Sequence, residues 1–385
     1  MKNISIRSTL VLSILGIISA ALLVVVEQSK DNHTQPYFEE KLAASRLMAT
    51  CLEHLKATHF PNEVALDNIN DPNDTRIIGP RYSPITSGRG SLPVKLSTTN
   101  PDFAALMVHY FKASALEKGD HVAVCGTGSF PSLNIATLAA AEVLGLEVSF
   151  IASVTSSSWG ANDPDYTFLD MSRSLIDGGL LSPRIISASI GANQDLGGTL
   201  SPEGRSLAEQ AIARYDAPII KGNSLAENIR TRMTLFDQRE QQLKKPIKMF
   251  INIGGGIASL GSDLNSSNLP SGLLEDVKLN LFPDKKGVMF EMASRGIILI
   301  NLRHVQRLID RFELPNPPPS SPPGLSSSRP GSGSPRCSLC ASNCGMPRTT
   351  IDTGASDSST TVPSTRPTRR RRPSAVCWNT VSRRR

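Results

Sequence analysis

The sequence predicts an α/β domain built on a mainly parallel β-sheet with helices on both faces. Along residues 100–314, short apolar segments with strand character alternate with helical segments, and the strands are almost continuously apolar. Such strands are typical of parallel sheets buried on both faces. Glycine-rich turns follow two of them, and ligands of such sheets bind beyond the carboxyl ends of the strands. We also expect one transmembrane helix before the domain and a disordered tail after it.

The N-terminus predicts a membrane anchor. An uncharged apolar run covers residues 9–26, the lower end of the length that spans a bilayer as a helix. Lys2 and Arg7 precede it, so residues 1–8 are expected in the cytoplasm and the domain outside it. A cleaved signal peptide is the competing interpretation, but the small residues that cleavage requires lie inside the run. The sequence therefore favours an uncleaved, single-pass signal-anchor in the cytoplasmic membrane.

Residues 27–99 are expected to form a juxtamembrane helix and a long loop. Apolar residues recur at helical spacing over residues 38–60, and a turn-rich stretch with three aspartates follows. Asp67, Asp71 and Asp74 suggest calcium, but their spacing does not match an EF-hand loop. We interpret them as solvated carboxylates in turns.

The α/β domain begins with a helix at Asn100. Asn100 can cap this helix, Pro101 suits its first position, and Gly119 is expected to end it. A strand, a glycine turn, a helix and a strand then occupy residues 121–154. The remaining predicted strands are 184–190, 217–220, 247–253, 287–290 and 296–301, and the remaining predicted helices are 168–179, 201–215, 224–241 and 302–312.

Charge and cysteines divide the chain into a body and a tail. Residues 316–385 contain eleven Arg, no Lys and two Asp and carry +9, whereas residues 1–315 carry −2. A nearly neutral body gives no reason to expect a nucleic-acid partner. Only Cys51 and Cys125 lie in the body, and two cysteines do not make a disulfide framework. We expect Cys125 to be a buried thiol in a strand.

Two glycine loops are candidate ligand sites. The first follows the strand at 121–125 and contains Gly126, Gly128 and Ser129; the second follows the strand at 247–253 and contains Gly254, Gly255, Gly256 and Ser259. The glycines allow positive φ and close backbone approach, and together with a helix capped by Ser129 they would present backbone N–H groups to an anion. Neither loop matches a dinucleotide, P-loop or G-x-S-x-G motif. Alternatively, the glycines serve only the tight turns between strand and helix and bind no ligand. The more specific hypothesis is that the two loops together form one ligand-binding cleft.

A third strand-end loop, "SSSWGANDPDY", could join them. Ser157, Trp159, Asn162 and Asp163 are candidate ligand contacts there, and loops of this kind often carry function. An Asn-Asp-Pro turn with a tryptophan covering the core explains the same residues equally well. No catalytic residue is assigned, because nothing local supports Ser129 as a nucleophile with His109 or His121 as base. No metal site is predicted, and the sequence does not identify a cofactor.

The chain resembles the bacterial poly-gamma-glutamate system protein family. The matching stretches, within residues 30–314, are "STTNPDFAALMVHYFK", "GTGSFPSLNIATLAAAEVLGL", "SSSWGANDPDYTFLDM", "LSPEGR" and "KPIKMFINIGGGIASLG". Members of this family are single-pass membrane proteins encoded with the machinery that makes and exports poly-γ-glutamate. The resemblance therefore implies an accessory role in synthesis of the capsule or released polymer, with other subunits of that machinery and the bilayer as partners. It implies no reaction and no catalytic residues.

The tail departs from the family. Residues 315–385 are rich in Ser, Pro and Arg, a composition that predicts disorder. Cys337, Cys340 and Cys344 could be read as part of a zinc site. We favour a frameshift near residues 314–316, with a natural basic tail that binds acidic polymer or lipid as the alternative.

These observations leave two classes of function. The first is a membrane-anchored accessory protein of poly-γ-glutamate synthesis or export. The second is an extracytoplasmic enzyme or ligand-binding sensor that acts on glutamyl polymer or a phosphorylated small molecule through the glycine loops.

Overall fold

The computed structural model describes residues 9–28, 35–59, 69–274 and 287–315. Its centre is a seven-stranded sheet in the order β10-β11-β9-β2-β3-β7-β8. All neighbours in this sheet pair in parallel except β10 with β11. The strands are β2 (His121–Thr127), β3 (Glu147–Ser153), β7 (Ile185–Ser189), β8 (Ile219–Ile220), β9 (Ile247–Ile253), β10 (Gly272–Leu274) and β11 (Ile298–Leu302). The predicted α/β fold with a mainly parallel sheet is confirmed.

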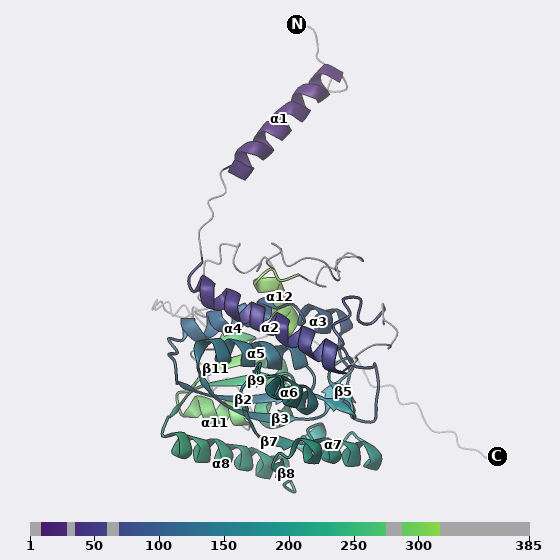
Figure 1. The fold of residues 1–385 in the computed structure, drawn as a ribbon, viewed down its shortest axis with the longest axis vertical. Coiled ribbons are helices and arrows are strands. Elements are labelled where there is room, and N and C mark those ends of the chain that lie inside the picture. Colours follow the sequence, from purple (N-terminus) through teal and green to yellow (C-terminus); the bar gives the residue numbers. More distant parts are fainter. Residues whose placement is uncertain (1–8, 29–34, 60–68, 275–286, 316–385) are drawn as a thin grey trace, which may run out of the picture. The chain divides into compact units, whose positions relative to one another are not determined.

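Helices cover both faces of the sheet, as Figure 1 shows for α2, α4 and α5 on one side and α8 and α11 on the other. Successive residues of a strand point to opposite faces, so Val122 and Val124 contribute to one core and Ala123 and Cys125 to the other. The first face carries α2 (Phe38–His59), α4 (Asp102–Ala113), α5 (Pro131–Leu144), α6 (Phe168–Asp177), α7 (Pro202–Tyr215) and α12 (Val305–Arg311); the second carries α8 (Leu225–Leu243), α9 (Ile257–Leu260) and α11 (Val288–Ser294).

Strand β2 is the point at which the strand order reverses. From β2 the chain adds β3, β7 and β8 outward on one side, and it then returns to place β9 and β11 on the other side. The carboxyl ends of β2 and β9 therefore flank the topological switch point. In open α/β sheets ligands bind outside the strand ends at such a point.

Helix α2 belongs to the helical layer of this domain. Its residues Met48, Cys51 and Leu55 are buried in the same core as α4 and α5. Cys51 and Cys125 are both free and buried, and burial raises the pKa of each thiol to about 12. Neither thiol is therefore reactive at neutral pH.

Two predicted elements are wrong. The helix that begins near Asn100 ends at Ala113, and Gly119 instead lies, with φ 86°, in the turn before β2. Residues 287–290, predicted as a strand, form the start of α11, where Val288, Met289 and Phe290 are buried. A short apolar run suits a buried helix as well as a buried strand.

Several short elements escaped prediction, because segments of two to six residues are too short to show a periodicity. They are β1 (Thr86–Gly88), α3 (Leu92–Ser97), β4 (Ser156–Ser157), β5 (Asn162–Asp163), β6 (Tyr166–Thr167), η1 (Asn193–Asp195), α10 (Asp263–Asn268) and β10. Two of them, α3 and β4, carry the candidate site described below.

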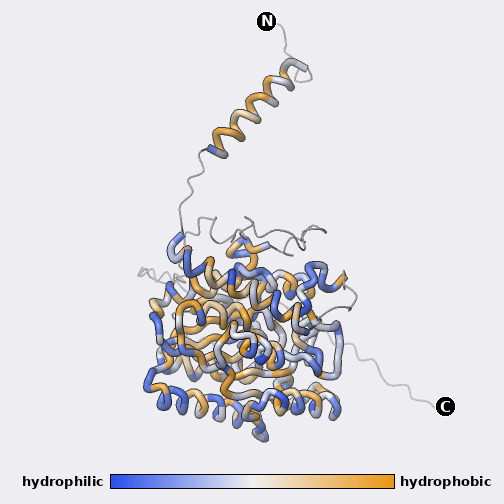
Figure 2. The backbone as a smooth tube through the Cα atoms, in the orientation of Figure 1, coloured by the Kyte–Doolittle hydropathy of each residue, from blue (hydrophilic) through white to orange (hydrophobic). Residues whose placement is uncertain are grey.

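The N-terminal helix α1 (Thr9–Gln28) is apolar along most of its length (Figure 2). Large apolar side chains such as Leu22, Leu23 and Val25 are 59–66% exposed. Among the described residues, no helix combines the length and apolar character that crossing a membrane requires. The predicted transmembrane helix is thus not confirmed. Residues 1–8 and the expected tail beyond Pro315, including its cysteines, lie outside the described residues.

A buried ion pair fixes the loop after β7 against α8. The guanidinium of Arg232, 1% exposed, donates to both carboxylate oxygens of Asp195 at 2.7 and 3.0 Å. Arg232 also donates to Ser189 Oγ at 2.7 Å, and Ser189 Oγ lies 3.0 Å from Ser153 Oγ. The loop needs this support because Ala192, Gln194 and Asp195 all have φ near 60°, a costly conformation for residues with a side chain.

We predict that Arg232→Ala lowers the free energy of unfolding by about 3–5 kcal/mol, because it leaves the Asp195 carboxylate buried without its counter-charge. Chemical denaturation of the full chain measures the loss. The matched control is Arg230→Ala: Arg230 is exposed on the same helix, and its change should stay within about 0.5 kcal/mol. Equal losses in the two variants would contradict this role for the ion pair.

Candidate functional site

The two glycine loops meet at the switch point through Thr127. The hydroxyl of Thr127 donates to the carbonyl of Ile253 at 3.4 Å and accepts from the N–H of Ser129 at 3.3 Å. Gly254 has φ 89°, and a Cβ on it would lie 2.3 Å from Thr127 Oγ1. Only glycine satisfies both conditions, so the end of β2 and the loop after β9 are packed directly against each other.

Close packing, and not positive φ, accounts for Gly126 and Gly128. Gly126 lies inside β2, and a Cβ there would come within 2.3 Å of the Phe150 ring. A Cβ on Gly128 would lie 2.6 Å from the carbonyl oxygen of Val154. Neither glycine is among those with positive φ, so the expected conformational role is wrong for both. Their small size allows the segment after β3 to lie directly on the first loop.

Ser129 does not cap α5 as predicted, because Phe130 occupies the N-cap position. The Ser129 hydroxyl instead accepts a hydrogen bond from the N–H of Ser157 at 3.0 Å. This hydrogen bond joins the first glycine loop to the loop that contains Ser157, two segments that the sequence analysis proposed as separate candidate sites.

A buried lysine completes the group. Lys95, on α3, is 2% exposed, and its ammonium nitrogen Nζ lies 2.9 Å from Ser157 Oγ. The same nitrogen donates to the carbonyl of Ser129 and lies 4.0 Å from the centre of the Phe130 ring. We call Lys95, Ser129, Phe130 and Ser157 the Lys95 site. The Phe130 ring also lies 3.7 Å from the Cβ position of Gly254, so the Lys95 site adjoins the second glycine loop.

The Lys95 amine has no acidic partner among the described residues. An uncompensated charge in a dry environment is costly, and a buried amine therefore loses its proton readily. Burial lowers the pKa of Lys95 from 10.5 to about 7. At neutral pH a large fraction of the amine is therefore neutral and able to accept a proton.

Strand pairing between distant segments brings Lys95 to Ser157. β1 pairs in parallel with β4, which places Thr86 opposite Ser156 and Gly88 opposite Ser157. The N–H of Ser158 donates to the carbonyl of Gly88 at 3.0 Å. The chain then turns at Gly90, where a Cβ would lie 2.3 Å from the carbonyl oxygen of Ser158. Because the chain passes this close to Ser158, α3 begins next to β4 and its Lys95 side chain reaches Ser157.

Trp159 follows Ser157 in a strained conformation. Its φ is 60°, a rare value for an aromatic residue. The guanidinium of Arg81 lies 5.8 Å from the centre of a Trp159 ring, and the indole N–H is buried without a hydrogen-bond partner in the described part of the chain. Strained backbone of this kind costs about 1–3 kcal/mol and concentrates at functional sites.

Asn162 and Asp163 do not belong to the Lys95 site. Asn162 is fully buried and donates to the carbonyl of Pro80 and to Thr86 Oγ1 at 2.8 and 2.7 Å, so it holds two loops together. Asp163 lines a cavity of about 190 Å³ with His59 and Asp71. Asp71 is 7% exposed and accepts from Thr75 and from the N–H of Arg76. The expectation that Asp71 is solvated is therefore wrong, and Asp67 lies outside the described residues.

The second glycine loop presents backbone groups and lies against one cation, Arg303, which follows β11. Gly255 is exposed and Gly256 is partly exposed. A Cβ on Gly255 would lie 2.4 Å from an Arg303 guanidinium nitrogen, so this arginine lies directly against the loop. Ser259 is 2% exposed within α9, which makes it a poor candidate for direct ligand contact.

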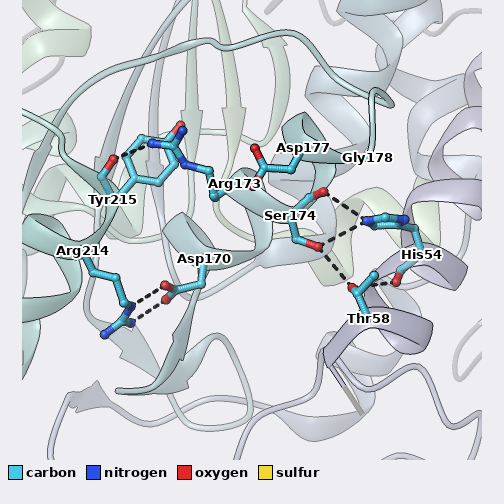
Figure 3. Close-up of a pocket in the computed structure, with 9 residues that line it drawn as sticks. All are labelled: His54, Thr58, Asp170, Arg173, Ser174, Asp177, Gly178, Arg214 and Tyr215. Atoms are coloured by element: carbon cyan, nitrogen blue, oxygen red, sulfur yellow. Dashed lines mark hydrogen bonds and ion pairs between the residues drawn. The ribbon is translucent and has the colours of Figure 1, made fainter. Parts of the chain in front are cut away.

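A larger cavity, of about 470 Å³, lies in the helical layer between α2, α6 and α7 (Figure 3). Its charged groups are largely paired: Arg214 binds Asp170 at 2.6 Å, and Arg173 donates to the Tyr215 carbonyl at 2.8 Å. Its lining residues are His54, Thr58, Asp170, Arg173, Ser174, Asp177, Gly178, Arg214 and Tyr215.

This cavity has a serine next to a histidine but no catalytic pair. His54 Nε2 lies 3.0 Å from the Ser174 carbonyl oxygen and 3.3 Å from Ser174 Oγ. A nitrogen that hydrogen-bonds a carbonyl oxygen must carry the proton, so it cannot take one from the hydroxyl. We interpret this contact as a tether between α2 and α6 and favour the Lys95 site.

The other histidines considered as bases are also structural. His121 Nε2 lies 2.8 Å from Ser149 Oγ and its Nδ1 lies 3.2 Å from the Lys245 carbonyl oxygen. The ring of His109 packs edge-on against Phe312. No group of three or more His, Cys, Asp or Glu side chains that could hold a metal ion occurs within the described ranges.

Comparison with known proteins found no match: no family model, no curated protein and no solved structure is similar to this chain. The resemblance to the poly-gamma-glutamate system family therefore stays an untested prediction.

We predict that Lys95→Met changes how stability depends on pH. Between pH 7 and 10.5 the unfolded chain holds the lysine proton and the folded chain does not, so wild-type stability rises with pH across this window. From the pKa of about 7, the free energy of unfolding of the wild type should rise by about 5 kcal/mol relative to the variant. Equilibrium unfolding at several pH values measures this, with the exposed Lys118→Met as control. Parallel pH curves would contradict it.

Proposed function

We propose that this protein is a component of poly-γ-glutamate synthesis or export that is attached to the cytoplasmic membrane through α1. The α/β domain then binds a glutamyl ligand at the switch point. The observation that carries the proposal is that the loops after β2, β3 and β9 meet at this point. Ser129 Oγ accepts from the N–H of Ser157 at 3.0 Å, and the Thr127 hydroxyl donates to the Ile253 carbonyl at 3.4 Å. The choice of polymer is supported by the sequence resemblance.

The exposed apolar surface of α1 supports the proposed membrane attachment. Contiguous apolar surface in a folded protein marks contact with a membrane or another protein. The positive residues Lys2 and Arg7 favour a cytoplasmic N-terminus and a domain outside the membrane. We expect the protein to have two kinds of partner, the bilayer and other subunits of the polymer machinery.

A specific observation favours an enzyme over a purely structural subunit. A structural site has no need of an amine that is buried without a counter-charge, because such burial reduces stability. Lys95 is buried in this way directly beside a partly exposed serine. The second candidate function is therefore an enzyme that acts on the same ligand.

Deletion of the gene tests the polymer assignment. We expect less poly-γ-glutamate, or polymer of altered length or location, and restoration by the wild-type gene. The variant Ser129→Ala should restore assembly with partner proteins but not polymer, whereas Ser174→Ala, in the helical layer, should restore both. Unchanged polymer after deletion would remove the assignment, and loss of assembly in Ser129→Ala would favour the accessory role.

Removal of residues 1–28 tests the membrane attachment. We expect the wild type in the membrane fraction, resistant to extraction at high salt because apolar contact is insensitive to screening, and the truncated chain in the soluble fraction. Folding of the truncated chain is checked by its unfolding transition. Equal distribution of the two chains would contradict the proposed role of α1.

A further inference from the structure

We propose that Ser157 is a catalytic nucleophile and Lys95 its general base, in a pair that hydrolyses or transfers the acyl group of a γ-glutamyl amide. The substrate class rests on the proposed function, whereas the assignment of the pair rests only on the geometry of the Lys95 site.

The neutral Lys95 amine has a lone pair within reach of the serine hydroxyl. A neutral amine has two N–H bonds and one lone pair. The Ser129 carbonyl accepts one N–H, and the face of the Phe130 ring, 4.0 Å away, lies beside the amine. In the structure Lys95 Nζ donates to Ser157 Oγ at 2.9 Å; once the amine has lost its extra proton, its lone pair is the group that accepts the proton of this hydroxyl. This distance is within the range of a nucleophile and its base.

The lysine is buried, whereas the serine is partly exposed. Lys95 is 2% exposed, while Ser157 and Ser129 are partly exposed. The groups that face the amine are the Ser157 hydroxyl, the Ser129 carbonyl and the Phe130 ring, and none of them is charged. Because burial alone lowers the pKa of the amine to about 7, the neutral base and its conjugate acid are both available near neutral pH.

The reaction balances with these two residues and water. Ser157 Oγ attacks the amide carbonyl carbon, and its proton moves to Lys95 Nζ. The tetrahedral intermediate collapses, the C–N bond breaks, and the Lys95 ammonium protonates the departing amine. Water then attacks the acyl ester and gives a proton to Lys95, which returns it to Ser157 Oγ as the ester bond breaks. An acceptor amine in place of water gives acyl transfer.

Cations near the pair suit a substrate that carries carboxylates. Arg89 is exposed and follows Gly88, which pairs with Ser157. Arg81 lies over Trp159, and Arg303 lies against Gly255. The γ-linked polymer carries one α-carboxylate on each residue, so it presents an anion beside every amide bond. The positive end of α5 begins two residues after Ser129 and also favours negative charge in this loop.

Ser129 is a positioning residue and not the nucleophile. Its hydroxyl accepts the N–H of Ser157 at 3.0 Å, and its carbonyl accepts from Lys95. It therefore fixes both members of the pair without facing a base of its own.

The test uses the full chain in detergent, a fluorophosphonate probe and purified poly-γ-glutamate. We expect the probe to attach to Ser157, identified by mass spectrometry, and new amino groups to appear as the polymer is cut. Ser157→Ala should abolish labelling and lower cleavage by at least about 10³-fold, and Lys95→Met should lower both rates by about 10²–10⁴-fold. In the wild type, the rate should rise as pH passes through 7.

The controls separate chemistry from folding. Ser174→Ala and Lys118→Met, outside the Lys95 site, should retain wild-type rates, and the unfolding transition of each variant verifies its fold. A probe on another serine, no labelling and no cleavage, or labelling that is insensitive to Lys95→Met in a folded protein would overturn the assignment.

The two proposals fail separately. If Ser157 is labelled but deletion of the gene leaves polymer unchanged, the pair acts on a different acyl substrate. If deletion alters polymer but Ser157 is inert, the polymer role stands without this reaction.

Discussion

Strand β2 pairs in parallel with β3 on one side and with β9 on the other, and this constraint determines where everything else lies. Because both neighbours run in the same direction, three strand ends and their loops meet at one edge of the sheet. The crossover that reverses direction at β2 also sends helices to both faces, which buries β2 completely. The loops at that edge therefore stand on a rigid base, while within them Ser129 and Ser157 are partly exposed and Gly255 is exposed. Catalytic and binding groups are held best in this arrangement.

Long apolar segments made the sheet predictable. The strands β2, β3 and β9 and the cap of α7 by Ser201, whose hydroxyl accepts from the N–H of Gly204 at 3.0 Å, follow from local sequence. The failures have local causes as well. The short apolar run at 287–290 suits a buried helix equally well, and nothing in the sequence distinguishes a helix end at Ala113 from one at Gly119. The pairing of β1 with β4 joins residues seventy positions apart and has no local signal.

The site was predictable in its loops but not in its chemistry. Ser129 and Ser157 were nominated because they follow strands, and the structure brings them into contact. Asn162 was nominated for the same reason, yet its amide nitrogen donates to two segments of the preceding loop and holds them in place. Lys95 was missed because its segment is too short to show periodicity and a lysine is ordinarily exposed. Its burial results from tertiary packing against Gly90 and β4, and a single sequence does not reveal such packing.

The register between β1 and β4 has a consequence for the order of events in synthesis of the chain. Lys95 leaves the ribosome about sixty residues before Ser157, and the two are brought together by the pairing of β4 with β1 beside Gly88. Until then the lysine is hydrated, carries its full charge and has no hydroxyl to act on. The amine and the hydroxyl are therefore in contact only in the folded domain, and not in the chain as it is being made.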